Sequence, residues 1–249
     1  MKIIAAILLI ACLLFSAIET VKSAETSRKN TSTASLGAGQ TFFRDEKNGY
    51  FSMIPPMGWK FSHYDDSRTK VDWRHPTDYN VLIRVIARAA TENMAEMLKN
   101  TQSTATQYNA RGIKTVVTEE RVGEHSAIVI DQWLDKGARS RIVLFIAGDV
   151  HFNAQYGASS ETLFQKHLDE ATRALSTLSP LPGRTQSKKV SSQEELAWYK
   201  RYSFLLFKIG DVKGGKVLAA EGLAKYPDDK ELKQMVNGIL PEKEPGAVR

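Results

Sequence analysis

A run of four strand-like segments in the middle of the chain limits the fold more than any other feature. The segments are rich in β-branched and aromatic residues, as strands are, and they span residues 114–122, 126–135, 140–147 and 151–156. Gly123 and Gly137 stand near two of the connecting turns, where hairpins often need glycine. Parallel neighbours require long crossover connections, so strands joined this closely run antiparallel. The pattern favours an α+β domain over a doubly wound one.

The two central segments carry apolar residues on both of their faces. In 126–135 the apolar side chains alternate between the faces, with Ile128, Ile130 and Leu134 on one and Val129 and Trp133 on the other. Residues 142–147 are apolar throughout. A sheet covered on one side would instead alternate apolar and polar residues. We therefore expect helices above and below a largely antiparallel sheet.

Further strand signals precede this run, and helical signals stand before and after it. The strand signals lie at residues 41–44, 50–54, 59–64, 71–74 and 81–89. One helix is predicted from a cap at Thr91 or Asn93 to Gly112. A second begins at the Ser159-Ser160 cap. Its apolar stripe comprises Leu163, Phe164, Leu168, Ala171, Leu175 and Leu178.

The stretch GYFSMIPPMGW, residues 49–59, marks the start of this domain. Prolines remove backbone donors and stiffen the chain, so Pro55 and Pro56 can end a strand. Gly58 permits a bend, and Trp59 supplies a large apolar group for the core. The stretch offers no group suited to proton transfer or nucleophilic attack. We interpret it as structural.

This start, the strand region SRIVLFIAGDVHFNAQYGAS and the closing helix together resemble the PsbP-like family. The matching features are Gly49-Tyr50-Phe51, a proline followed by Gly58-Trp59, and Phe152 after a Gly148-Asp149-Val150 turn. The resemblance covers residues 41–180 and implies an α/β/α sandwich. None of the family's ion-binding positions can be matched to this sequence, and the fold alone implies no activity.

The N-terminus has the layout of a signal peptide, with a lysine, an uncharged apolar run at 3–18, and small residues near Ser23. We expect residues 1–23 to be removed on export to the periplasm or the extracellular space. Residues 24–40, rich in Ser and Thr, would form a flexible linker. The alternatives are an uncleaved membrane anchor, because the apolar run is only slightly short for a span, and lipidation at Cys12.

The cysteine count and the charge exclude several classes of function. Cys12 is the only cysteine, so a cleaved chain would contain no disulfide, thiol nucleophile or thiolate metal site. The net charge is +6, which in an exported protein fits solubility or an anionic envelope surface better than nucleic acid. We expect no nucleic-acid partner, and membrane contact only through a retained leader.

A break containing prolines and a glycine begins at Ser179 and supplies a linker at 181–190, before the helical segment 191–240. This segment resembles a single tetratricopeptide repeat, with matches at Tyr199, Ser203, Leu206, Gly210, Gly215, Ala219, Gly222 and Pro227. Such arrays need several repeats to bury a core. A lone repeat must therefore dock on the first domain, bind another chain or remain marginally stable, and Tyr199, Leu206 and Leu223 are the predicted partner contacts. Its last helix should end near Leu240, before a disordered tail at 241–249.

No motif for catalysis or for a cofactor is present. The five histidines, His63, His75, His125, His151 and His167, lack the spacing of a zinc site. His125 and His151 are the better placed, and could form a site only if distant strands brought them together. The sequence contains neither a GxSxG elbow nor a phosphate-binding loop. We expect no catalytic residue, no bound metal and no cofactor.

Charged residues inside predicted strands are the remaining candidates for a site. Arg84, Arg88, Asp131 and Arg141 each stand among apolar neighbours. Because buried charges usually pair, an arginine that approaches Asp131 would form a structural ion pair or the floor of a binding cleft.

The interpretation that follows is a non-catalytic, exported binding or adaptor protein of the bacterial cell envelope, acting through contacts with an envelope protein. The alternative is an accessory protein that binds a small ligand or a metal in a cleft of the sandwich.

Overall fold

The computed structural model describes residues 42–45, 48–65, 69–182, 192–242 and 245. The expected leader at 1–23 and linker at 24–40 lie outside these residues, as do most of the linker 181–190 and most of the tail 241–249.

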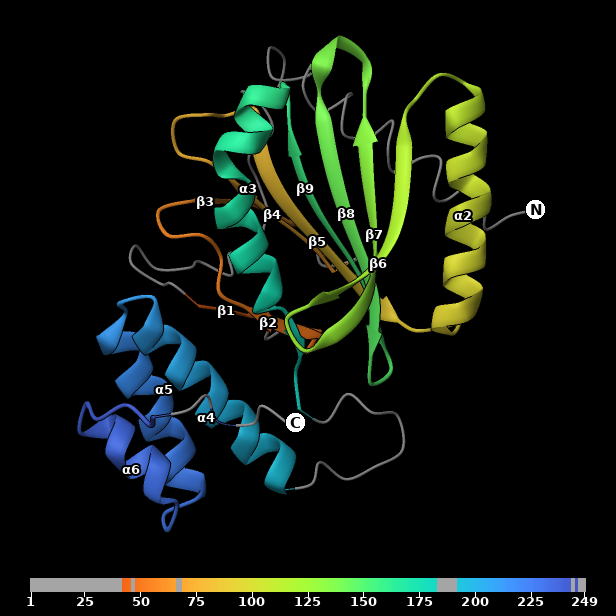
Figure 1. The fold of residues 1–249 in the computed structure, drawn as a ribbon. Coiled ribbons are helices and arrows are strands. Elements are labelled where there is room, and N and C mark those ends of the chain that lie inside the picture. Colours follow the sequence, from red (N-terminus) through yellow and green to blue (C-terminus); the bar gives the residue numbers. More distant parts are fainter. Residues whose placement is uncertain (1–41, 46–47, 66–68, 183–191, 243–244, 246–249) are drawn as a thin grey trace.

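A seven-stranded antiparallel sheet forms the centre of the molecule (Figure 1). In spatial order its strands are β3 (Lys60–Asp65), β4 (Lys70–Arg74), β5 (Val81–Ala89), β9 (Val150–Ala158), β8 (Arg139–Ala147), β7 (His125–Trp133) and β6 (Thr115–Val122). The short turn η2 (Asp135–Gly137) joins β7 to β8. The four strands predicted between residues 114 and 156 are confirmed, and each pairs antiparallel with the next along the chain.

Helices cover the two faces of this sheet, which confirms the predicted α+β class. Helix α2 (Met94–Ala110) begins at an Asn93 capping box and contacts β6. Helix α3 (Glu161–Ser176) begins at a Ser160 cap and contacts β9, β5 and β8. Because successive residues of a strand point to opposite faces, alternate side chains of a strand point to the side of the sheet on which α3 lies and to the side on which α2 lies.

The two sides of the sheet differ in how fully they are packed. The α3 face holds a large core that includes Trp73, Phe145, Phe152 and Tyr156, all of which are fully buried. The Tyr156 hydroxyl donates to the carbonyl of Phe164 on α3 at 2.7 Å. The α2 face holds a smaller cluster formed by Met97, Ile128, Ile130, Ile142 and Leu144. The core under α2 is the thinner of the two.

A separate small sheet stands at one end of the large one. Its strands are β1 (Phe43–Arg44), β2 (Phe51–Met53) and β10 (Ser179–Pro180). The prediction placed a break at Ser179, but this residue pairs with Ser52 on β2. Pro180 is tolerated because β10 is an edge strand, where a missing backbone donor costs little. Pro55 and Pro56 follow β2, and Trp59 is buried in the α3-side core, in line with the structural interpretation of this stretch.

The C-terminal segment forms the helices α4 (Ser192–Lys208), α5 (Val212–Lys225) and α6 (Lys230–Val236). The prediction that the last helix runs to near Leu240 is wrong, because Gly238 takes a φ of +82° and turns the chain.

Helix α4 docks on β2. Phe51 and Met53 of β2 belong to the core of the large sheet, whereas Ile54, just after β2, packs with the C-terminal helices. Trp198 Nε1 donates to Ser52 Oγ at 3.0 Å, and the Tyr202 hydroxyl donates to the carbonyl of Ser52, also at 3.0 Å. The C-terminal helices therefore dock on the first domain, which is one of the outcomes predicted for this segment.

Candidate functional site

The four charged residues predicted for an ion pair or a cleft floor lie on opposite faces of the sheet. Arg141 donates to both carboxylate oxygens of Asp131, at 2.9 and 2.8 Å, on the α3 face. Arg84 belongs to the α2 side of β5 and donates to both oxygens of Asp72 at 2.8 Å. Arg88 shares that side and donates to His151. Of the three arginines that the sequence offered as partners of Asp131, Arg141 forms the ion pair, whereas strand alternation turns Arg84 and Arg88 to the other face.

A pocket of about 130 Å³ lies between α2 and the sheet. Helix α2 leaves this space because Thr101, Thr104 and Ala105 line it with short side chains, while Met97 and Tyr108 supply larger ones. The sheet contributes an apolar floor, made by Ile86, Ile130, Ile142 and Leu144.

One part of the pocket wall is polar and connected by hydrogen bonds. Arg88 Nε donates to His151 Nδ1 at 3.0 Å, and Arg88 Nη2 lies 3.9 Å from Glu92 Oε1. Asn100 of α2 donates to Glu92 Oε2 at 3.3 Å. All four of these residues line the pocket. The pocket therefore combines an apolar floor with a charged, hydrogen-bonded rim.

His151 is the polar group of this pocket that the protein leaves incompletely satisfied. Its Nδ1 accepts a hydrogen bond from Arg88, so its proton resides on Nε2. Nε2 is buried and has no hydrogen-bond partner among the residues that the structure describes. Burial and, to a lesser extent, the charge of Arg88 together lower the pKa of His151 to about 4. The side chain is thus a neutral imidazole with an unused donor.

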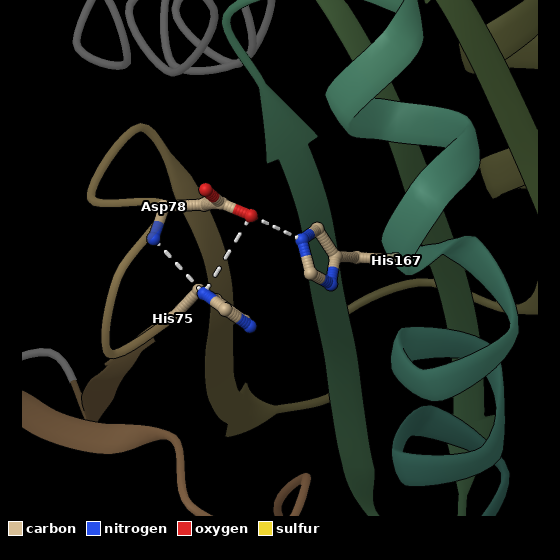
Figure 2. Close-up of side chains that lie close together, drawn as sticks. All are labelled: His75, Asp78 and His167. Carbon is tan, nitrogen blue, oxygen red and sulfur yellow. Dashed lines mark hydrogen bonds and ion pairs between the residues drawn. The ribbon is translucent and has the colours of Figure 1, made fainter.

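A second polar group lies on the opposite side of the sheet, where the turn between β4 and β5 meets α3. Figure 2 shows His75 and Asp78 from that turn beside His167 of α3. Asp78 Oδ2 lies 2.6 Å from His167 Nε2 and 3.8 Å from His75 Nδ1. One ligand atom from each residue lies within 4.8 Å of the others. We refer to His75, Asp78 and His167 as the His-Asp-His cluster.

The protonation of this cluster follows from its neighbours. Burial lowers the pKa of His75, and the charge that His167 can carry lowers it further. His75 Nδ1 accepts the backbone N–H of Asp78 at 3.0 Å, which requires an unprotonated nitrogen. Hydrogen bonds from Lys166 and then His167 lower the pKa of Asp78. The cluster at neutral pH therefore contains a neutral His75 and an ionised Asp78.

Neighbouring side chains hold the two imidazole rings in place. The rings have centroids 4.1 Å apart, and Trp59 stands edge-on to both, at 5.5 Å from His75 and 6.3 Å from His167. Glu170, one helical turn after His167, places Oε2 3.6 Å from His167 Nδ1. Sequence reasoning missed this cluster because nothing in the spacing of residues 75 and 167 indicates that they meet. A histidine and an aspartate three positions apart in a turn were the only local signal.

The two histidines that the sequence favoured belong to no such group among the described residues. His151 lines the α2 pocket, and His125 stacks on Phe145 with ring centroids 4.7 Å apart. The side chain of His63 lies outside the described residues.

The predicted partner contacts on the C-terminal helices face the inside of that segment. Tyr199 and Leu206 are buried in its core, and Leu223 packs against it. These side chains are used for packing within the chain, so a partner of the helices would have to meet other residues.

No family model and no curated protein matches the chain. Solved structures similar to it include one from Bacteroides thetaiotaomicron, with 11% identity and a TM-score of 0.44 over 79% of this chain and 74% of the other. Cyanobacterial PsbP from Synechocystis is 10% identical, with a TM-score of 0.40 over 60% of this chain and 98% of the other. LpqN, involved in cell envelope biogenesis of Mycobacterium tuberculosis, is 14% identical, with a TM-score of 0.39 over 57% of this chain and 90% of the other. At these identities and TM-scores, the activities and partners of these proteins do not carry over to this chain.

Among the described helices, none is both long and apolar enough to cross a membrane.

Proposed function

We propose that this chain is a non-catalytic binding protein whose α2 pocket holds a small, largely apolar molecule that carries a hydrogen-bond acceptor. The observation that supports this most is the buried Nε2 of His151, which lines an apolar pocket without a partner among the described residues. A buried donor without an acceptor costs about 1–3 kcal/mol. A ligand oxygen placed against this donor would remove that cost.

The pocket also indicates the size and charge of the ligand. An engineered cavity of about 150 Å³ in another protein accepts benzene, so a pocket of about 130 Å³ suits a ring or a short chain of similar size. The guanidinium of Arg88 lies at the rim beside His151. Glu92 offsets part of that charge. A carboxylate would accept from His151 and lie near Arg88, so we favour small monocarboxylic acids, for which benzoate is a convenient probe.

The test measures thermal stabilisation of the full-length chain by benzoate, with benzyl alcohol as the neutral analogue. At a hundred times its dissociation constant, a ligand stabilises the folded state by about 2.7 kcal/mol. We expect benzoate to raise the melting temperature more than benzyl alcohol does. Ala105→Leu fills the pocket from α2 and should abolish the shift. Ala95→Leu makes the same change at an exposed position of α2 and should leave the shift intact.

Two results would contradict the proposal. The first is the absence of stabilisation by either compound in the unsubstituted chain. The second is equal stabilisation of the Ala105→Leu and Ala95→Leu variants, which would place the binding elsewhere. The melting temperatures of both variants without ligand show whether Ala105→Leu is still folded.

A second candidate function is the adaptor role that the sequence suggested, with the C-terminal helices acting as a tetratricopeptide-like surface. Exposed apolar side chains favour it, namely Val212 and Val217 on α5 and Ile239 and Leu240 after α6. A partner bound through them should be retained by the full chain and lost in Val217→Lys or Ile239→Lys. Retention by both variants would exclude this surface.

Export to the cell envelope is part of the same proposal and rests on the apolar run at 3–18. The mass of the chain recovered from the envelope fraction tests it. Loss of residues 1–23 is the expected result, and an intact N-terminus in a membrane fraction would favour the anchor instead.

A further inference from the structure

We propose that the His-Asp-His cluster, formed by His75, Asp78 and His167, binds a divalent zinc ion. This site is independent of the ligand pocket, because it lies on the α3 side of the sheet. Two imidazole nitrogens and one carboxylate oxygen are a set that zinc takes in sites with three protein ligands, where the fourth position is open to water. Imidazole ligands also favour zinc over magnesium or calcium, which prefer oxygen.

One ligand atom from each of the three residues lies within 4.8 Å of the others, so small side-chain movements would bring them to the spacing that zinc requires. Zinc bonds to nitrogen and oxygen are about 2.0–2.2 Å long, so ligand atoms in a tetrahedral site stand about 3.3 Å apart. His75 Nδ1 is 3.8 Å from Asp78 Oδ2, and His167 Nε2 is 2.6 Å from the same oxygen. The shorter distance is a hydrogen bond, and a metal ion would replace the proton that it contains. His75 can bind through Nδ1, at the cost of the hydrogen bonds that it now accepts from the backbone N–H groups of Thr77 and Asp78, or by turning its ring to present Nε2.

The surroundings supply the supports that metal-bound histidines usually have. A metal-bound histidine commonly donates its other ring N–H to a carboxylate, which fixes the tautomer and the ring orientation. Glu170 Oε2 stands 3.6 Å from His167 Nδ1, the nitrogen that remains when Nε2 takes the metal. Trp59, edge-on to both rings, restricts their rotation. The side chain of His167 is almost entirely buried, and those of His75 and Asp78 keep a small exposed part through which an ion could enter.

One residue opposes the metal and can be removed. Lys166 Nζ lies 2.9 Å from Asp78 Oδ2, so it competes for the ligand oxygen and repels a cation. Its side chain is 59% exposed and can swing into solvent when the ion binds. A site that served only as a polar link between the turn and α3 would be weakened by the loss of this lysine, whereas a metal site would be strengthened.

The experiment titrates zinc chloride into the full-length, untagged chain by isothermal titration calorimetry. We expect a single zinc ion per chain. His75→Gln and His167→Gln should each lower the affinity by at least about tenfold, and Glu170→Gln by about tenfold. Lys166→Gln should raise it severalfold. His125 stacks on Phe145 and does not belong to the cluster, so His125→Gln is the matched control and should bind as the unsubstituted chain does.

The proposal is overturned if the unsubstituted chain shows no stoichiometric binding up to about 1 mM zinc. It is also overturned if His75→Gln and His167→Gln bind as tightly as the His125→Gln control. Melting temperatures without zinc show whether a histidine variant has unfolded. In that case Lys166→Gln, an exposed substitution, decides: tighter binding supports the site, and unchanged or weaker binding rejects it.

Discussion

At the scale of single residues, His151 links the stability of the fold to pH. Its pKa is lowered from 6.5 to about 4 by burial and by Arg88. Between these values the unfolded chain takes up a proton that the folded chain does not, so stability falls as the pH falls. Each unit by which the pH falls in this window lowers the free energy of unfolding by about 1.4 kcal/mol. By pH 4 the free energy of unfolding should have fallen by about 3 kcal/mol. Urea unfolding across the window measures the loss, and His151→Gln should flatten it. An unchanged slope in the variant would assign the loss to other groups.

The two bidentate ion pairs offer a comparison in which burial is the main variable. Side chains of Asp72 and Arg84 are 6% and 7% exposed, and those of Asp131 and Arg141 are 17% and 25% exposed. Removing one partner of a buried pair costs about 3–5 kcal/mol, because the other charge stays buried. We expect Asp72→Asn to lower the free energy of unfolding by about 3–5 kcal/mol. Asp131→Asn should lower it by about 1 kcal/mol. Chemical denaturation measures both, and equal losses would contradict the role assigned to burial.

These residues also show how far a sequence can predict a site. Asp131 and Arg141 stand on adjacent strands of a predictable hairpin, so their meeting could be anticipated. Arg84 could not be assigned to Asp72 without the register of β4 and β5. His75 and His167 meet only because α3 packs over the turn after β4, and that contact leaves no trace in local spacing. The pair across the β7–β8 hairpin was therefore accessible to prediction, whereas the pair across β4 and β5 and the contact between a turn and a distant helix were not.

At the scale of elements, Gly222 sets how closely α4 and α5 approach. A Cβ added at Gly222 would stand 2.8 Å from Tyr199 Cβ on α4. Alanine normally favours a helix over glycine by about 1 kcal/mol. We expect Gly222→Ala to destabilise the chain nonetheless, by about 1–3 kcal/mol, because the helices would have to separate. Ala224→Gly, at an exposed position of α5, measures the difference in helix propensity between alanine and glycine without the close contact. Stabilisation by Gly222→Ala in thermal unfolding would contradict the close approach.

Element boundaries were predictable where capping and turn residues mark them. Asn93 and Ser160 cap α2 and α3, and Gly112 has a φ of +82° after α2, as their residue types indicate. The exception is β10, where Ser179 and Pro180 pair with β2 although a proline and a neighbouring glycine normally indicate a break. A strand of two residues depends on the partner that tertiary packing provides, so local sequence does not reveal it.

At the scale of the whole molecule, Tyr202 couples the sandwich to the C-terminal helices. The proton of its hydroxyl, on α4, is shared between the carbonyls of Ser52 and Thr177, and burial raises the pKa of Tyr202 to about 12. We expect calorimetry to show one unfolding transition for both parts. Tyr202→Phe should lower the free energy of unfolding by about 1–3 kcal/mol, because two buried carbonyls lose this donor. Tyr226→Phe, which removes a bond to the less buried Glu195, should cost less. Two separate transitions would contradict the coupling.

The class of the whole fold was accessible from the sequence, and its assembly was not. Short turns and two-faced apolar strands predicted a sandwiched antiparallel sheet, because both are local properties. The insertion of β9 between β5 and β8, and the docking of α4 on β2, depend on contacts between distant segments. The pocket under α2 depends on the fit of two surfaces, so the sequence offered no sign of it.

The position of β9 has a consequence for the order in which the molecule forms. β3, β4 and β5 pair as neighbours along the chain, as do β6 to β9, whereas β5 pairs with β9 across the long gap from Ala89 to Val150. Pairings between distant segments form slowly because a large loop must first close. On the ribosome this seam must wait until β9 has emerged, and α3 and α4 follow it. Synthesis therefore delivers the two halves, the strand that joins them and the helices that cover them in the order in which they can be assembled.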